Sequence, residues 1–203
     1  MPSRFFAIIP AAGTSTRMGT PKLLLPVAGT KMIEKTIRAW QGSRMYRIVV
    51  VIRPGDDELV RVCQSSGMVD VVVPPSAPPQ MKDSVQCALR HLEVTYSPAP
   101  DDAWLMAPAD MPHLSPQVMN TLLWEHDPQR PSILVPTIEG RRGHPVLFPW
   151  TLLPEVYQLA ESEGLNVLQQ RHPCREVPCD GPEIYGDAAF ADIDTPDDYQ
   201  RLK

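Results

Sequence analysis

Short apolar runs separated by longer mixed segments dominate the pattern of this chain. A short apolar run bounded by turn residues is typical of a strand that is buried on both faces of a sheet. Six such runs predict strands at 5–9, 47–52, 69–73, 103–107, 132–135 and 145–148. Two weaker runs predict further strands near 175–178 and 189–193.

Helical spacing of apolar residues fills most of the segments between these runs. Ile33, Ile37 and Trp40 share one helix face, and later segments repeat that spacing, with further helices expected at 151–161, at 164–171 and from 196. The alternation predicts an α/β fold, a Rossmann-like three-layer α/β/α sandwich with a mostly parallel (mixed) sheet, in one domain over 1–203. Ligands bind such sheets at the carboxyl ends of the strands.

The loop after the first strand is suited to binding phosphate. Ala11, Ala12 and Gly13 let a ligand approach the backbone, Gly13 can adopt a positive φ, and successive amides can form an anion-binding concavity. Arg17 can grip two phosphate oxygens and Lys22 adds a point charge. The spacing fits neither a Walker A loop nor the Rossmann dinucleotide motif. An ordinary connection with two solvated cations is the alternative.

The same segment, 11–24, reads A-A-G-x-S-x-R-M-G-x-P-K-L-L. It resembles the motif of nucleotidyltransferases with a MobA-like NTP-transferase domain, which include molybdenum-cofactor cytidylyl- and guanylyltransferases. The resemblance implies a fold of the nucleotide-diphospho-sugar transferase type. It also implies Arg17 and Lys22 as catalytic residues, with Arg17 on β/γ oxygens and Lys22 on the α-phosphate. The implied triphosphate-binding backbone comprises Ala11, Ala12, Gly13, Thr14 and Ser15.

Asp110 follows the strand predicted at 103–107 and is expected at the ligand-binding edge. Nucleotidyl transfer needs Mg²⁺, which typically takes one or two protein carboxylates plus phosphates and waters. In the family that the chain resembles, an Asp in a matching D-x-P element is a metal ligand, and Asp110 inherits that role. A turn or capping Asp before a helix near Ser115 is the alternative.

The C-terminal segment 190–199 resembles the family element D-I-D-T-P-E-D-Y/L, where a second metal ligand is expected. We favour Asp192, with Asp194 as its competitor, because Asp194 can instead cap the helix that Thr195 and Pro196 open. The acidic residues of the first helical turn favour the helix dipole.

Two further elements resemble substrate-contacting parts of the family. Ser84 matches a G-M-x-x-S-[LV] element that contacts the nucleobase, although Gln80 stands where Gly is usual and Ser84 also suits a helix N-terminus. The segment 140–148 resembles G-x-x-G-H-P-V-L-F, which makes Arg142 and His144 candidates for binding an anionic acceptor. A turn with solvated arginines is the alternative.

One stretch departs from the family pattern. Cofactor cytidylyltransferases often carry G-D-x-G-A-R-x-L-L, but the segment 161–168 lacks the Asp and the Arg. This departure weakens the assignment of a molybdopterin acceptor.

Composition narrows the function further. A net charge of −5 argues against a nucleic-acid-binding surface. No apolar run approaches the roughly 20 residues of a membrane span, and no signal peptide is predicted, so we expect a cytoplasmic protein without a membrane partner. The cysteines have no metal-ligand spacing and predict inert thiols; they are Cys63, Cys87, Cys174 and Cys179.

These patterns together favour a Mg²⁺-dependent nucleotidyltransferase that transfers NMP from an NTP, with CTP or GTP favoured, to a small phosphorylated acceptor such as molybdopterin. The partners are then the NTP and the acceptor, with the chain a monomer or weak homodimer. Three alternatives stay open: a sugar-phosphate or alcohol-phosphate acceptor, a non-catalytic nucleotide-binding protein, and a protein-interaction module.

Overall fold

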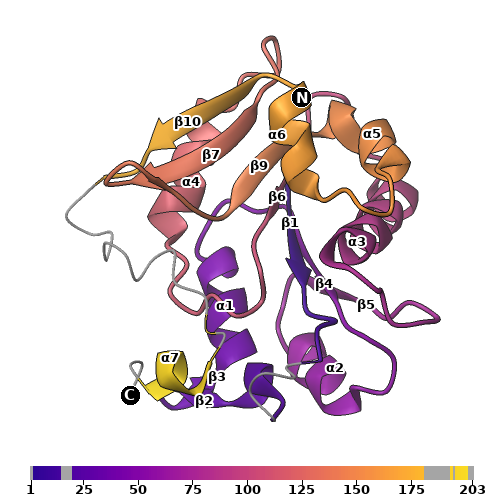
Figure 1. Cartoon of the computed structure of the whole chain (residues 1–203), viewed down its shortest axis with the longest axis vertical. Coiled ribbons are helices and arrows are strands. Elements are labelled where there is room, and N and C mark those ends of the chain that lie inside the picture. Colours follow the sequence, from indigo (N-terminus) through magenta and orange to yellow (C-terminus); the bar gives the residue numbers. More distant parts are fainter. Residues whose placement is uncertain (1, 15–19, 181–192, 194, 201–203) are drawn as a thin grey trace.

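The computed structural model describes residues 2–14, 20–180, 193 and 195–200. Within this part of the chain, eight strands form one sheet in the order β10-β7-β9-β6-β1-β4-β5, with β8 paired to β7 (Figure 1). The strands of this sheet are β1 (Phe5–Pro10), β4 (Arg47–Val51), β5 (Val69–Val72), β6 (Ala103–Met106), β7 (Ile133–Ile138), β8 (Arg141–Arg142), β9 (Val146–Pro149) and β10 (Cys174–Pro178). All six strong strand predictions and the first weak one are therefore confirmed. The other weak prediction, 189–193, lies outside the described residues except for Ile193, which is in no strand.

The sheet is mixed but mostly parallel. β1 pairs in parallel with β4 and β6, and β4 pairs in parallel with β5. β9 runs antiparallel to both β6 and β7, and β10 is parallel to β7. The carboxyl ends of β1, β4, β5, β6 and β7 therefore share one edge of the sheet, which we call the carboxyl edge.

Helices cover both faces of the sheet, as the alternating pattern predicts. The α-helices are α1 (Met32–Gln41), α2 (Asp57–Gln64), α3 (Met81–Tyr96), α4 (Pro116–Glu125), α5 (Leu153–Gln158), α6 (Leu168–Arg171) and α7 (Pro196–Gln200). The 3-10 helices are η1 (Lys22–Leu24), η2 (Trp150–Leu152) and η3 (Leu165–Val167). A separate small hairpin pairs β2 (Pro26–Val27) with β3 (Thr30–Lys31). The three-layer α/β/α prediction is confirmed.

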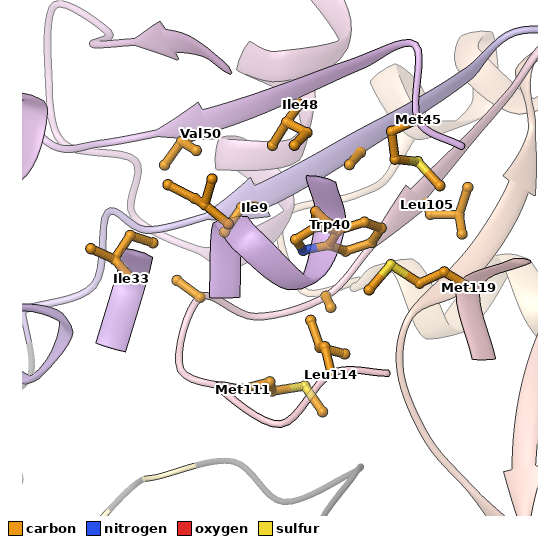
Figure 2. Packing of buried hydrophobic residues seen from close by; sticks show 14 of the residues in the cluster. Ile9, Ile33, Trp40, Met45, Ile48, Val50, Leu105, Met111, Leu114 and Met119 are labelled. Atoms are coloured by element: carbon orange, nitrogen blue, oxygen red, sulfur yellow. The ribbon is translucent and has the colours of Figure 1, made fainter. Parts of the chain in front are cut away.

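Two hydrophobic clusters fill the spaces between the layers. The first packs α1, α2, α4 and α7 against one face of the sheet, around the fully buried Trp40, which Figure 2 shows among Ile9, Ile48, Leu105 and Met119. The second packs α3, α5 and α6 against the other face. Burial of this apolar surface on both sides stabilises the sheet at about 25 cal/mol per Å² and fixes the positions of the loops along the carboxyl edge.

Among the described residues, no helix is both long enough and apolar enough to cross a lipid bilayer.

Candidate active site at the carboxyl edge

The loop after β1 begins at the centre of the carboxyl edge. The Ala11 amide donates to the Val51 carbonyl at 2.8 Å, so the loop is attached to the end of β4. Gly13 does not adopt the positive φ that the sequence allowed. Among the described residues, a Cβ built on Gly13 would meet nothing within 4 Å, so the backbone at this position is open to the close approach of a ligand.

Thr14 is exposed beside this open backbone, whereas Ser15 and Arg17 lie outside the described residues. Their assigned roles stay predictions.

Lys22 returns toward the carboxyl edge at the start of η1. Its ammonium group lies 2.5 Å from Asp110 Oδ2 and donates to the Ile193 carbonyl at 3.0 Å. The adjacent Leu23 is buried in the first cluster and anchors this turn. The loop thus extends from the end of β1 to bring a cation against a carboxylate that follows β6.

Asp110 lies in a turn beyond the end of β6, five residues before Ser115, which is the N-cap of α4. It is therefore not a helix cap. Thr36 Oγ1 donates to the preceding carbonyl, of Ala109, at 3.0 Å and holds the turn against α1. The Asp110 side chain is 14% exposed, and its Oδ1 is buried without a hydrogen-bond partner among the described residues. A buried carboxylate oxygen is rarely left in that state, so this atom fits a role as a metal ligand.

Ile193 carries the C-terminal segment into the same site. Its amide donates to the Asp110 carbonyl at 3.2 Å, and its side chain is buried in the first cluster. Asp192 and Asp194 flank it and lie outside the described residues, so the choice between them stays open. Among the residues that the structure does describe, no group of three His, Cys, Asp or Glu side chains could hold a metal.

Helix α7 is capped by Thr195. The Thr195 hydroxyl accepts the Asp198 amide at 3.2 Å, and Asp198 Oδ2 accepts the Thr195 amide at 2.9 Å. This is the reciprocal arrangement of a capping box. Tyr199 then donates to the Pro26 carbonyl at 2.6 Å and ties α7 to the small hairpin. The sequence analysis allowed Asp194 as the cap of this helix, and the structure shows Thr195 in that role.

His113 is a titratable residue three positions after Asp110 that the sequence motifs did not single out. Burial, and secondarily the charge of Lys35, lowers the pKa of its imidazole and so favours the neutral ring.

The candidate base-contacting residue Ser84 lies in the first turn of α3. It is buried, with 3% of its surface exposed. The exposed surface at this helix start belongs instead to Gln80 and Met81. The assignment of Ser84 as a base contact stays a prediction. Because Ser84 is buried, Gln80 and Met81 are the more accessible residues at this helix start.

The candidate acceptor residues lie at the end of β7. Glu139 and Gly140 both have positive φ, at 51° and 76°, and form the tight turn from β7 to β8. Arg142 Nε donates to Glu176 Oε1 at 2.7 Å, and this pairing raises the pKa of Arg142. His144 is half-buried and precedes β9, whose first residue pairs with Met106 at the end of β6. Both candidates thus share the carboxyl edge with Asp110, and their roles stay predictions.

Comparison with known proteins agrees with this fold. The model of the MobA-like NTP transferase domain matches residues 7–177, and the chain belongs to this family. A probable molybdenum cofactor guanylyltransferase of Bacillus cereus strain B4264 is 24% identical over 200 residues, covering 97% of this chain and 94% of the relative. A 2-C-methyl-D-erythritol 4-phosphate cytidylyltransferase of Streptomyces coelicolor is 28% identical over 167 residues, covering 79% of this chain. That match spans only 54% of the Streptomyces protein.

Solved structures support the same assignment. The crystal structure of Rv0371c from Mycobacterium tuberculosis H37Rv has a TM-score of 0.78 and 27% identity, covering 100% of this chain and 98% of the mycobacterial chain. A complex of that protein with manganese has a TM-score of 0.76 and 26% identity, covering 98% of both chains. The predicted family and the predicted nucleotide-diphospho-sugar transferase type of fold are confirmed.

Proposed function

We propose that this protein is a metal-dependent nucleotidyltransferase that transfers NMP from an NTP to a phosphate-bearing acceptor and releases pyrophosphate. The observation that carries the proposal is the contact of Lys22 with Asp110 at the carboxyl edge, the same edge at which the loop with the open backbone of Gly13 begins. A cation, a carboxylate with a buried oxygen and an accessible backbone are the groups that a triphosphate and its metal require.

Each residue has a distinct role in this proposal. The backbone of 11–15 cradles the triphosphate and Arg17 binds its β and γ oxygens. Lys22 stabilises the charge that develops on the α-phosphate as an acceptor phosphate oxygen attacks and pyrophosphate leaves. The acceptor phosphate is already a nucleophile, so positioning and charge stabilisation suffice for catalysis.

Asp110 and Asp192, with Asp194 as the alternative to Asp192, would hold the metal. When bound, Mg²⁺ neutralises phosphate oxygens and orients them. Two findings support this assignment: the buried Asp110 Oδ1 without a partner among the described residues, and the manganese complex of the mycobacterial relative. The position of Ile193 supports Asp192 or Asp194 as the second ligand, because the backbone of Ile193 is hydrogen-bonded to both Lys22 and Asp110.

The favoured donor is CTP or GTP. For the acceptor we propose a molybdopterin-type phosphate, bound by Arg142 and His144, and the Bacillus relative supports this class. The Streptomyces relative supports a second candidate, an alcohol phosphate. We also propose that the chain acts in the cytoplasm, which the free thiols of its four cysteines support. We propose further that it acts as a monomer or weak homodimer.

Thermal unfolding in the presence of CTP, GTP, ATP and UTP, each with and without Mg²⁺, tests the binding part of the proposal. A ligand at one hundred times its dissociation constant stabilises the fold by about 2.7 kcal/mol, which raises the melting temperature measurably. A Mg²⁺-dependent rise with one nucleotide supports the proposal and identifies the donor. The absence of any rise contradicts it.

A further inference from the structure

Two segments far apart in the sequence are joined at the start of α3. Gln80 Nε2 donates to the Glu161 carbonyl at 3.0 Å. Lys82 Nζ donates to the same carbonyl at 2.7 Å and also to the carbonyl of Ala160. We call these contacts the Gln80–Lys82 clamp. They hold the loop 159–164, which follows α5, against the first turn of α3.

The clamp is a strong constraint because Lys82 is buried, with 6% of its surface exposed. A buried ammonium group is costly unless hydrogen bonds compensate its lost hydration, and the two carbonyls provide them. Glu163 holds the loop from its other side, since its carboxylate accepts the Ala160 amide at 3.0 Å and pairs with Arg171. The loop is therefore fixed from both sides.

The clamp lies at the carboxyl edge. Helix α3 follows β5 and runs back along the sheet, and its far end lies at the opposite edge, where Arg4 donates to the Tyr96 and Ser97 carbonyls just before β1 begins. The start of α3 is therefore next to the ends of β1 and β4. Helix α3 contacts both of these strands, and Val85, Ile8 and Val51 belong to one hydrophobic cluster.

The clamp and the Lys22–Asp110 pair lie on opposite faces of the sheet, because α3 and α5 belong to the second cluster while Leu23, Ala109 and Ile193 belong to the first. A nucleotide whose phosphates meet Lys22 and the 11–14 loop, and which extends across the edge, brings its base to the start of α3. The clamp also joins the two places where the chain departs from the pattern it resembles, at Gln80 and in 161–168.

We propose that the Gln80–Lys82 clamp makes the loop 159–164 a fixed wall of the nucleobase site and thereby sets which nucleotide the protein accepts. This inference rests on the nucleotidyltransferase function proposed above. Gln80 and Lys82 are positioning residues in this account, because they act through the loop. A wall held by three hydrogen bonds discriminates bases by size and shape, and a loosened wall discriminates less.

The variant Gln80→Gly removes the hydrogen bond that the Gln80 side chain donates to the loop 159–164. The variant Lys82→Met removes the two that Lys82 donates. Gln80 is also the N-cap of α3, with an extended backbone at φ of −135°, and glycine fits there without strain and is tolerated at a helix N-cap. Gln86→Ala is the matched control, because Gln86 Nε2 also joins α3 to α5, donating to the Val156 carbonyl at 2.8 Å, but one turn further from the edge. Circular dichroism checks that each variant is folded, and Gln80→Gly carries the test if Lys82→Met does not fold.

The dissociation constants of CTP, GTP, ATP and UTP with Mg²⁺ are measured for each protein, together with KM and kcat for pyrophosphate release. We expect the preference for the best nucleotide over the others to fall by at least about fivefold when a clamp bond is lost, through KM rather than kcat, and to be unchanged in Gln86→Ala. Unchanged preference in a folded Gln80→Gly protein overturns the inference alone. Failure of the wild-type protein to bind any NTP overturns the proposed function as well.

Discussion

Lys22 and Asp110 are 88 residues apart in the sequence, and their side chains meet at 2.5 Å. Both side chains are 14% exposed, so solvent screens the pair only partly. Lys22, the cation expected to contact the α-phosphate, is thus paired with Asp110, the carboxylate expected to hold the metal. In the proposed reaction this pair separates when a nucleotide and its metal bind, because Lys22 then pairs with phosphate and Asp110 with the metal.

The first prediction concerns the Lys22→Ala variant. We expect it to fold normally, because the aliphatic core around Leu23 is retained, and to turn over at least about a hundredfold more slowly, since a preorganised charge on the transition state is lost. Pyrophosphate release measures the rate. Lys31→Ala is the control, because Lys31 is also paired with a carboxylate, at 2.8 Å, but with that of Glu58 rather than that of Asp110. Wild-type turnover in a folded Lys22→Ala protein would remove Lys22 from the mechanism.

A second prediction concerns metal binding by Asp110. Asp110→Asn keeps the side-chain shape and removes the charge. We expect Mn²⁺ affinity in the presence of nucleotide to fall at least about tenfold, as it does when even an outer-shell partner is lost. Mn²⁺ electron paramagnetic resonance measures the bound fraction without relying on activity. If Asp110→Asn binds Mn²⁺ as tightly as the wild-type protein, Asp110 is not a ligand.

The Lys22–Asp110 contact gives a third prediction, on Mn²⁺ binding without nucleotide. The Lys22 ammonium repels a cation from Asp110 while no phosphate is present to draw it away. Lys22→Ala is therefore expected to bind Mn²⁺ more tightly than the wild-type protein in the absence of NTP, in a titration monitored by the same resonance signal. Equal or weaker Mn²⁺ binding in the variant would show that the Lys22 ammonium group and Mn²⁺ do not compete for the Asp110 carboxylate.

The two buried cysteines give a fourth prediction. Burial is the main cause that raises the pKa of Cys63 to about 12 and that of Cys179 to about 11. Both thiols are therefore protonated at pH 8 and inaccessible, and we expect them to react with iodoacetamide only after unfolding. Mass spectrometry of native and denatured samples locates the label. Rapid native labelling of either residue would contradict the burial described here.

Sequence patterns predicted most of the fold because buried parallel strands are continuous apolar runs. They missed β2, β3 and β8, since a strand of two residues has no measurable periodicity. The single helix expected at 151–161 is instead η2 followed by α5, and 164–171 is η3 followed by α6. Each of these segments begins as a 3-10 turn, which apolar spacing alone does not distinguish from an α-helix.

The site was predictable where it depends on strand ends. The sequence placed the 11–14 loop and Asp110 beyond the ends of two strands, and the structure confirms those positions and shows in addition that the two strands are neighbours. It did not predict that Lys22 meets Asp110 directly, nor that Gln80 binds a carbonyl 81 residues away. Such contacts depend on tertiary packing between segments, and no local pattern specifies them.

Release of pyrophosphate is the measurement that decides whether this protein is a nucleotidyltransferase. Purified protein is incubated with Mg²⁺, one of CTP, GTP, ATP and UTP, and either a molybdopterin-type or an alcohol phosphate acceptor. We expect release of pyrophosphate with one NTP and one acceptor class, together with transfer of the labelled NMP to the acceptor, and loss of both in Lys22→Ala. Nucleotide binding without pyrophosphate release from any acceptor in the panel would contradict the claim of catalysis and favour a nucleotide-binding protein.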